Sequence, residues 1–155
     1  MSERSTQHAT FVIEREYAAT PSRVFAAWSD PTEKAKWFAG PPDWPQGPYE
    51  LDFRIGGRER ASGGPVGGAV NTYEATYRDI VPNERIVHVY DMYLDDTRTS
   101  VSLATVELKP RRGGTHLTYT EQTVFLDGYD SAHRRELGTR QLLDALGSLL
   151  ERRMA

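Results

Sequence analysis

Residues 98–154 constrain the fold more than any other part of the sequence. Two segments in which the side chains alternate in character, RTSVSLATVELKP at 98–110 and THLTYTEQTVF at 115–125, flank a Gly-Gly turn. A period of two is typical of half-buried strands. Farther on, a stripe of leucines recurs at helical spacing, at Leu142, Leu143, Leu146, Leu149 and Leu150. A hairpin followed by one long amphipathic helix predicts a curved sheet closed by that helix, with a functional site in the interior between them.

Composition narrows the class of protein. The chain has 155 residues, enough for one domain with a sizeable core, and no cysteine, which excludes thiol nucleophiles, disulfides and cysteine-bound zinc. A net charge of −3 gives no electrostatic attraction for nucleic acid. Neither a signal peptide nor a run of the ~20 apolar residues that a membrane span needs is apparent. We therefore expect a cytoplasmic protein with no membrane contact, residues 1–9 being a disordered tail and 10–155 a single domain.

Two helix starts follow the first predicted strand, which covers residues 10–18. Thr20 and Asp30 each precede a proline, so each combines an N-cap residue with the residue favoured at the first helical position. Glu33 is placed to complete a capping box with Asp30. The second short helix is expected to end at residues 37–38.

The stretch from 49 to 125 reads as strands joined by connections too short for helical crossovers. This pattern predicts an antiparallel sheet of about six to seven strands, the second beginning as YELDFRI at 49–55. Residues 56–68 contain six glycines and are expected to form a flexible hairpin or lid. Asp130 is the expected cap of the last helix, which should begin near Ser131 and run past Leu149. The fold class is α+β.

Several longer motifs resemble those of a known superfamily. They are VFAAWSDP at 24–31, KWF at 36–38, DFRIGGR at 52–58, YRDIVPNERIV at 77–87, GTHL at 114–117, TEQ at 120–122 and FLDGY at 125–129. In these motifs the chain resembles the START-like (SRPBCC, Bet v 1-like) helix-grip superfamily. Within it, the chain is similar to bacterial stand-alone relatives of the C-terminal domain of the activator of heat-shock-protein ATPase.

The resemblance spans about residues 11–150 and implies a fold and a site. The fold is a curved antiparallel sheet around a long C-terminal helix, with two short helices after the first strand. The site is a cavity between sheet and helix, in proteins often named as chaperone activators or polyketide cyclases. Many relatives carry tryptophan after the glycine that corresponds to Gly138, whereas this chain has Thr139, so that aromatic side chain is missing from the mouth of the expected cavity.

Strand parity predicts which side chains face the closing helix. The inward set is mainly aromatic with a few polar groups, which is the composition of a small-molecule pocket. The expected cavity residues are Trp37, Phe53, Tyr73, Tyr77, His88, Tyr90, Met92, Tyr119, Glu121, Leu142 and Leu146. The alternative is that these aromatic side chains only fill the core. On the pocket interpretation, the ligand is a small hydrophobic or aromatic molecule.

Glu121 is the main polar candidate, because an inward carboxylate needs a partner or takes up a proton. Arg54 and His88 are its candidate partners, and a ligand is the alternative. With Tyr119 and His88, Glu121 could also serve as a catalytic acid or base, so a cyclase or hydrolase in the same cavity is an alternative function. A third is a module that binds a chaperone or regulator through its outer surface.

The remaining candidates give no cofactor or metal site. His133-x-x-Glu136 has helical spacing for two metal ligands, but no third ligand is near in sequence, which makes surface pairing the better interpretation. The outward parity is apolar at Val101 and Leu103, with valines at 87 and 89 on the neighbouring strand. This outer sheet face is therefore a candidate homodimer surface.

Overall fold

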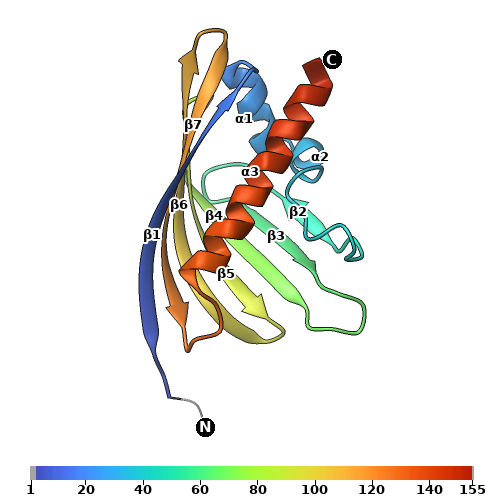
Figure 1. Cartoon of the computed structure of the whole chain (residues 1–155), viewed down its shortest axis with the longest axis vertical. Coiled ribbons are helices and arrows are strands. Elements are labelled where there is room, and N and C mark those ends of the chain that lie inside the picture. The colour runs from blue at the N-terminus through green and yellow to red at the C-terminus, as the bar shows by residue number, and fades with distance from the viewer. Residues whose placement is uncertain (1–2, 155) are drawn as a thin grey trace.

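The computed structural model describes residues 3–154 and has the expected helix-grip α+β architecture. Figure 1 shows a curved sheet that wraps around one long helix, α3. The elements, in chain order, are β1 (Thr6–Tyr17), α1 (Pro21–Ser29), α2 (Pro31–Lys34), β2 (Tyr49–Leu51), β3 (Arg58–Gly63), β4 (Asn71–Val81), β5 (Arg85–Leu94), β6 (Thr97–Arg111), β7 (Gly114–Leu126) and α3 (Ala132–Met154). Among the described residues, no helix combines the length and the apolar character that a bilayer crossing requires.

All seven strands belong to one antiparallel sheet in the order β1-β7-β6-β5-β4-β3-β2. Strands 2 to 7 form a meander, and β1 returns to pair with the last strand. That pairing begins at Thr6 with Leu126 and runs to Tyr17 with Thr115. The expected disordered tail is therefore wrong for residues 6–9, because the free edge of β7 offers their backbone groups hydrogen-bond partners.

The β6–β7 hairpin has the predicted tight turn. Arg112 and Gly113 both have positive φ angles, 44° and 81°, which is the type I′ geometry that matches the twist of two antiparallel strands. Gly114 follows, and a Cβ there would lie 2.3 Å from the carbonyl oxygen of Tyr17. Only glycine therefore lets the end of β1 pass so close to the start of β7.

The glycine-rich segment is not simply a lid. Its middle forms β3, which pairs with β4 from Arg58 and Thr76 to Gly63 and Asn71. Strand β2, by contrast, stops at Leu51, four residues before the predicted end. The glycines obscured the alternation within β3, where the inward Glu59 is buried between two exposed arginines.

The short helices start as predicted but end differently. The Asp30 side chain accepts hydrogen bonds from the backbone N–H groups of Thr32 and Glu33. The capping box is absent because the Asp30 N–H donates to the Ala26 carbonyl, while the Glu33 carboxylate pairs with Arg23 and Lys36. Helix α2 ends at Lys34, before the predicted residues 37–38.

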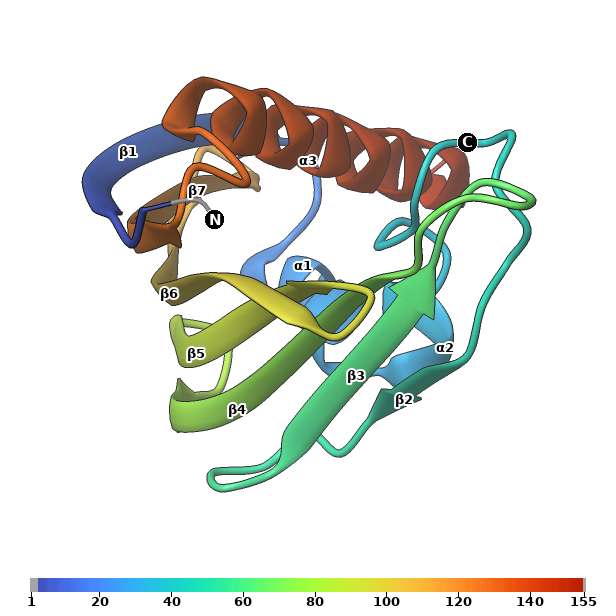
Figure 2. The same ribbon diagram turned by 90° about the horizontal axis from the view of Figure 1, so that it is seen from below.

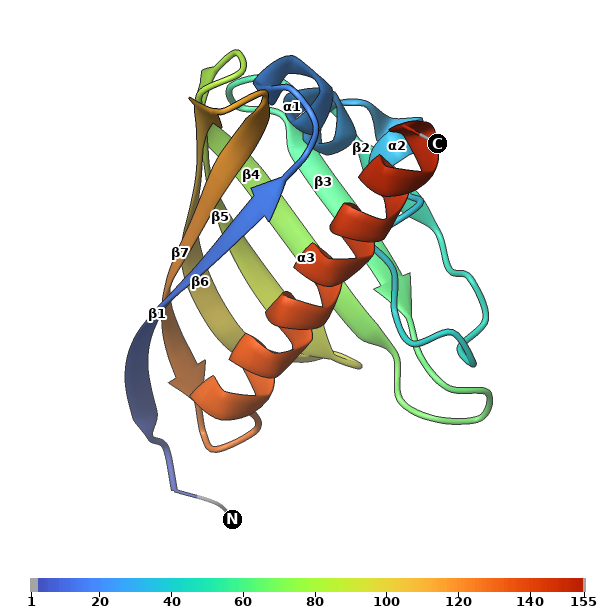
Figure 3. The same ribbon diagram turned by 45° about the horizontal axis from the view of Figure 1, so that its top comes forward.

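Helix α3 crosses the concave face of the sheet (Figures 2 and 3). Its leucine stripe packs into the core. Ser131, not Asp130, caps it: the Ser131 hydroxyl accepts from the Arg134 N–H. Strand β1 holds the helix through the Tyr17 hydroxyl, which donates to the Leu143 carbonyl, and through Arg15, which lies 3.2 Å from Asp144. Burial of each leucine stabilises this packing by about 1.5–3 kcal/mol.

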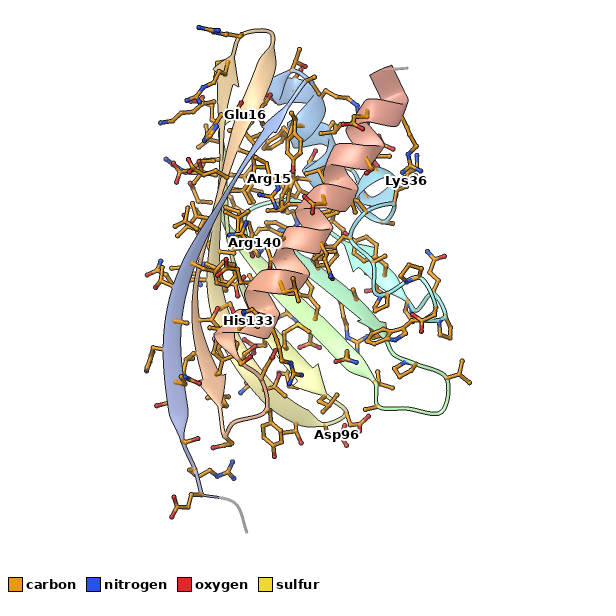
Figure 4. The ribbon with its side chains drawn as sticks, in the orientation of Figure 1. Arg15, Glu16, Lys36, Asp96, His133 and Arg140 are labelled. Atoms are coloured by element: carbon orange, nitrogen blue, oxygen red, sulfur yellow. The ribbon has the colours of Figure 1, made fainter. Side chains whose placement is uncertain are left out.

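Figure 4 labels residues that lie toward the two ends of the molecule. His133 lies near the start of α3, at the same end of the molecule as Asp96 in the β5–β6 turn. Glu16 and Lys36 lie toward the opposite end. The predicted pair of His133 with Glu136 is replaced by an ion pair between Glu136 and Arg140, 2.8 Å apart.

Candidate functional site

The predicted inward parity is confirmed by burial. Cross-strand pairing places Tyr77, His88, Ala104 and Glu121 in one row across β4, β5, β6 and β7, and all four are buried. The pleat makes such a row point to one face of the sheet, here the face beneath α3. The row combines two large rings, one small residue and one carboxylate.

Glu121 is fully buried, and its partner is Arg135 of α3, not Arg54 or His88 as predicted. The Arg135 Nη1 lies 3.2 Å from the Glu121 Oε2. Arg54 instead pairs with Asp52 at the exposed surface. The prediction failed because Arg54 lies beyond the end of β2, whereas the first turn of α3 passes over β7.

Four hydroxyl groups also donate to the Glu121 carboxylate. Tyr119 donates to Oε1 at 2.7 Å, and Tyr90 and Thr123 donate to Oε2 at 2.7 and 2.6 Å; Ser102 lies 3.2 Å from Oε2. Arg135 and three of these hydroxyls therefore gather at Oε2, and Tyr119 is the partner of Oε1. Glu121 therefore orients the tyrosines and anchors α3.

A second buried ion pair joins α2 to β3. The Lys34 Nζ lies 2.8 Å from the Glu59 Oε1, and both residues are almost completely inaccessible to solvent. Tyr77 and Tyr49 also donate to the Glu59 carboxylate, at 2.7 and 2.6 Å. Burial raises the pKa of Glu59, but the Lys34 charge and these hydrogen bonds outweigh it and hold that pKa below its usual value.

Aromatic rings surround the Lys34 ammonium. It lies 4.4 Å from the ring centroid of Phe38, 5.4 Å from that of Trp28 and 6.0 Å from that of Trp37. Such cation–π contacts stabilise a desolvated ammonium by about 2 kcal/mol or more. The charge of Lys34 is therefore accommodated by Glu59 together with the ring faces.

Lys34, Glu59 and Arg135 were not identified from the sequence. The sequence patterns that could have indicated these three residues differ in strength. Arg135 and Thr139 continue the leucine stripe backward by one turn each, so the helical period could have placed Arg135 on the inner face. Glu59 alternates with exposed arginines, a strand signal hidden by the neighbouring glycines. Lys34 had no signal beyond its proximity to Trp37 and Phe38 in sequence.

His88 lies between the two ion pairs and is 3% exposed. Its ring is 5.5 Å from that of Tyr77 and 6.0 Å from that of Tyr90, measured between centroids. Its Nδ1 has no hydrogen-bond partner among the described residues. Burial, reinforced by the Lys34 charge, lowers the pKa of His88 to about 4, although the two buried carboxylates oppose this shift, so the imidazole is neutral at physiological pH.

The predicted cavity residues differ in their ring contacts and in their burial. Ring contacts connect Phe53, Tyr77, His88, Tyr90 and Tyr73, with successive centroids 4.8–6.0 Å apart. The fully buried members of the predicted set also include Trp37, Tyr119 and Leu146. Phe53, Met92 and Leu142 are only partly buried.

Two surface hollows lie away from this interior. One of about 250 Å³ is lined by residues 45–48, 62–65 and 68–70. The other, about 530 Å³, lies on the outer face of β1, β5, β6 and β7, where Val101 and Leu103 are each 37% exposed. Within the described part of the chain, no three His, Asp or Glu side chains gather closely enough to hold a metal ion.

Comparison with known proteins identifies relatives with this architecture. The family described as Activator of Hsp90 ATPase homolog 1-like protein matches residues 18–151. The structure of an uncharacterized protein from Rhizobium leguminosarum is 48% identical, with a TM-score of 0.93, over 97% of this chain and 99% of that one. Mll3558 from Rhizobium loti is 44% identical, with a TM-score of 0.87, over 94% of this chain and 99% of that one.

A more distant structure shares the fold alone. CalU16 from Micromonospora echinospora is 19% identical, with a TM-score of 0.65, over 99% of this chain and 88% of that one. No match was found among curated proteins.

Proposed function

The chain belongs to the family of Activator of Hsp90 ATPase homolog 1-like proteins, and from that premise we propose that it binds a small hydrophobic or aromatic molecule between the sheet and α3. One observation carries the proposal: His88 is buried among aromatic rings, yet its Nδ1 has no partner within the described residues. A buried polar atom left without a hydrogen bond costs about 1–3 kcal/mol. A bound molecule that supplies this bond offsets that cost.

The surroundings of His88 suit a flat apolar ligand. Ala104 and Ala75 lie on the inner face beside His88 and Tyr90, respectively. Small side chains are therefore next to large rings at this part of the sheet. Ring faces supply apolar contact area, and each Å² removed from water contributes about 25 cal/mol. The two ion pairs hold the rings in place at both ends.

The contacts of Glu121 favour binding over the cyclase or hydrolase alternative. Its oxygens accept hydrogen bonds from Arg135 and four hydroxyl groups, and the Tyr119 O–H is one of these donors. A general acid or base must instead have an atom within reach of the reacting group. Of the three candidate residues, His88 has a ring nitrogen, Nδ1, without any hydrogen-bond partner among the described residues.

A thermal-shift screen of planar aromatic and fatty molecules tests the proposal. We expect at least one class to raise the melting temperature of the wild-type protein. Ala104→Leu adds a larger side chain on the inner face beside His88 and should abolish that rise, while Thr105→Leu, on the opposite face of the same strand, should retain it. Equal shifts in both variants would place the binding site elsewhere.

We also propose that two copies of the chain associate through the outer sheet face. The observation behind this second proposal is the hollow that includes the half-exposed Val101 and Leu103 at the centre of a sheet face. A two-fold axis would bring this apolar patch against its own copy. Leu103→Lys should shift a dimer to monomer in sedimentation velocity, whereas Thr118→Lys, outside the hollow, should not. A wild-type protein that sediments as a monomer at high concentration excludes the dimer.

A further inference from the structure

We infer that the ligand is uncharged and presents a hydroxyl or carbonyl group to the Nδ1 of His88. This inference rests on the proposed binding function and adds the chemical class of the ligand. Three features of the interior support it: the balance of its charges, the state of the tyrosine hydroxyls on either side of His88, and the chemistry of a neutral imidazole.

The charges beneath α3 and α2 are already paired. Lys34 is matched with Glu59 at 2.8 Å, and Arg135 is matched with Glu121 at 3.2 Å. Arg135 also contacts Asp130 at 3.3 Å, so the interior has no cationic excess. A carboxylate ligand would lose its hydration and meet two buried carboxylates without gaining a free cation, which strongly disfavours its binding.

The hydroxyls next to His88 are saturated. Tyr77 donates to Glu59 and lies 3.3 Å from the Lys34 Nζ, which donates to it. Tyr90 likewise donates to Glu121 and accepts from Arg135 at 3.0 Å. Neither hydroxyl can bind a ligand without giving up a charge-assisted hydrogen bond, and such bonds are about twice as strong as neutral ones.

The Nδ1 of His88, which lies between these two tyrosines, has by contrast no hydrogen-bond partner among the described residues. A neutral imidazole carries one N–H and one lone pair, and either tautomer can place the donor or the acceptor at Nδ1. It can therefore accept from a ligand hydroxyl or donate to a ligand carbonyl. Tyr77 and Tyr90 on either side of the imidazole favour a planar aromatic group attached to that oxygen.

Three probes of matched shape test this class by isothermal titration at pH 7.5: naphthalene, 2-naphthol and 2-naphthoate. The wild-type protein should bind 2-naphthol about fivefold to tenfold more tightly than naphthalene, the gain expected from one net hydrogen bond. It should bind 2-naphthoate most weakly. His88→Phe keeps an aromatic ring but removes the nitrogen, so it should bind naphthalene and 2-naphthol equally. His133→Phe, on α3, is the matched control and should preserve the preference.

Nitrogen NMR of the unmodified protein gives an independent readout. Addition of 2-naphthol should shift the Nδ1 resonance of His88 and leave those of His116 and His133 in place. Retention of the preference by a folded His88→Phe variant, or equal binding of 2-naphthoate and 2-naphthol, would overturn the inference while leaving the binding function intact. If none of the probes binds the wild-type protein, the proposed function fails together with the inference.

Discussion

The buried neutral imidazole of His88 makes folding stability depend on pH in a way that can be calculated. In the unfolded chain His88 titrates at its ordinary pKa of about 6.5, whereas burial, reinforced by Lys34, lowers the pKa in the folded protein to about 4. Above pH 6.5 both states are neutral and the contribution is complete. As the pH falls from 6.5 to 4, the unfolded chain takes up a proton that the folded protein does not, so stability is lost.

This loss of folding stability is measurable at pH values above those at which protonation of the carboxylates dominates acid unfolding. With these pKa values, one histidine should lower the free energy of unfolding by about 2 kcal/mol between pH 7 and pH 5, and by about 3 kcal/mol once the pH is below 4. His88→Phe removes the titrating group and keeps a ring of similar shape. Urea unfolding followed by tryptophan fluorescence should therefore give a flatter pH profile for His88→Phe than for wild type.

His116 provides a control of opposite sign. Hydrogen bonds that its ring N–H groups donate to Glu16 and Glu14 raise its pKa, so it stabilises the folded protein below its ordinary pKa and this contribution is lost as the pH rises through the folded value. His116→Gln should consequently weaken the protein more at pH 6 than at pH 8. Parallel pH profiles for wild type and His88→Phe would refute the argument, because His88 would then not be buried in a neutral form.

Other predictions concern the ion pairs and the hairpin. Glu59→Gln should lower the free energy of unfolding by about 3–5 kcal/mol in urea denaturation, since it leaves Lys34 charged and buried, and Lys34→Met combined with Glu59→Leu should recover much of that loss. Arg135→Met leaves a buried carboxylate without its cation; amide exchange should increase in the first turns of α3, whereas an unchanged pattern would show that the pair does not anchor the helix. Gly114→Ala places a methyl group against the Tyr17 carbonyl and should lower the melting temperature by several degrees; an unaltered melting curve would contradict the close approach of β1.

The inner face of the sheet was predictable because the pleat fixes the period of two. Alternation within each strand places Tyr119 and Glu121 inward on β7 and His88 and Tyr90 inward on β5, and the structure confirms this. The leucines of α3 were predictable for the equivalent reason at the helical period. Patterns of this kind need no knowledge of the neighbouring element.

The partners of the charges were not predictable, because they depend on which elements cross. Arg54 precedes two glycines on a segment that leaves the sheet after Leu51, so its charge reaches Asp52 and solvent. Arg135 meets Glu121 only because α3 crosses β7 near its first turn. Glu59 was hidden for a local reason, since glycines on both sides lower strand propensity although pairing with β4 overrides it.

The two buried ion pairs are better explained by geometry than by stability. Replacing a buried pair with apolar residues of similar volume is often neutral or stabilising, so a chain under selection for stability alone has little reason to keep either one. Each carboxylate here binds two tyrosine hydroxyls as well as its cation: Tyr49 and Tyr77 at Glu59, and Tyr90 and Tyr119 at Glu121. The pairs thereby fix the rings on either side of His88 and occupy the hydroxyl groups of Tyr77 and Tyr90, while the Nδ1 of His88 has no partner among the described residues. This is the arrangement that the proposed function requires: ring faces to contact an apolar molecule and the Nδ1 of His88 to select among such molecules by a hydrogen bond.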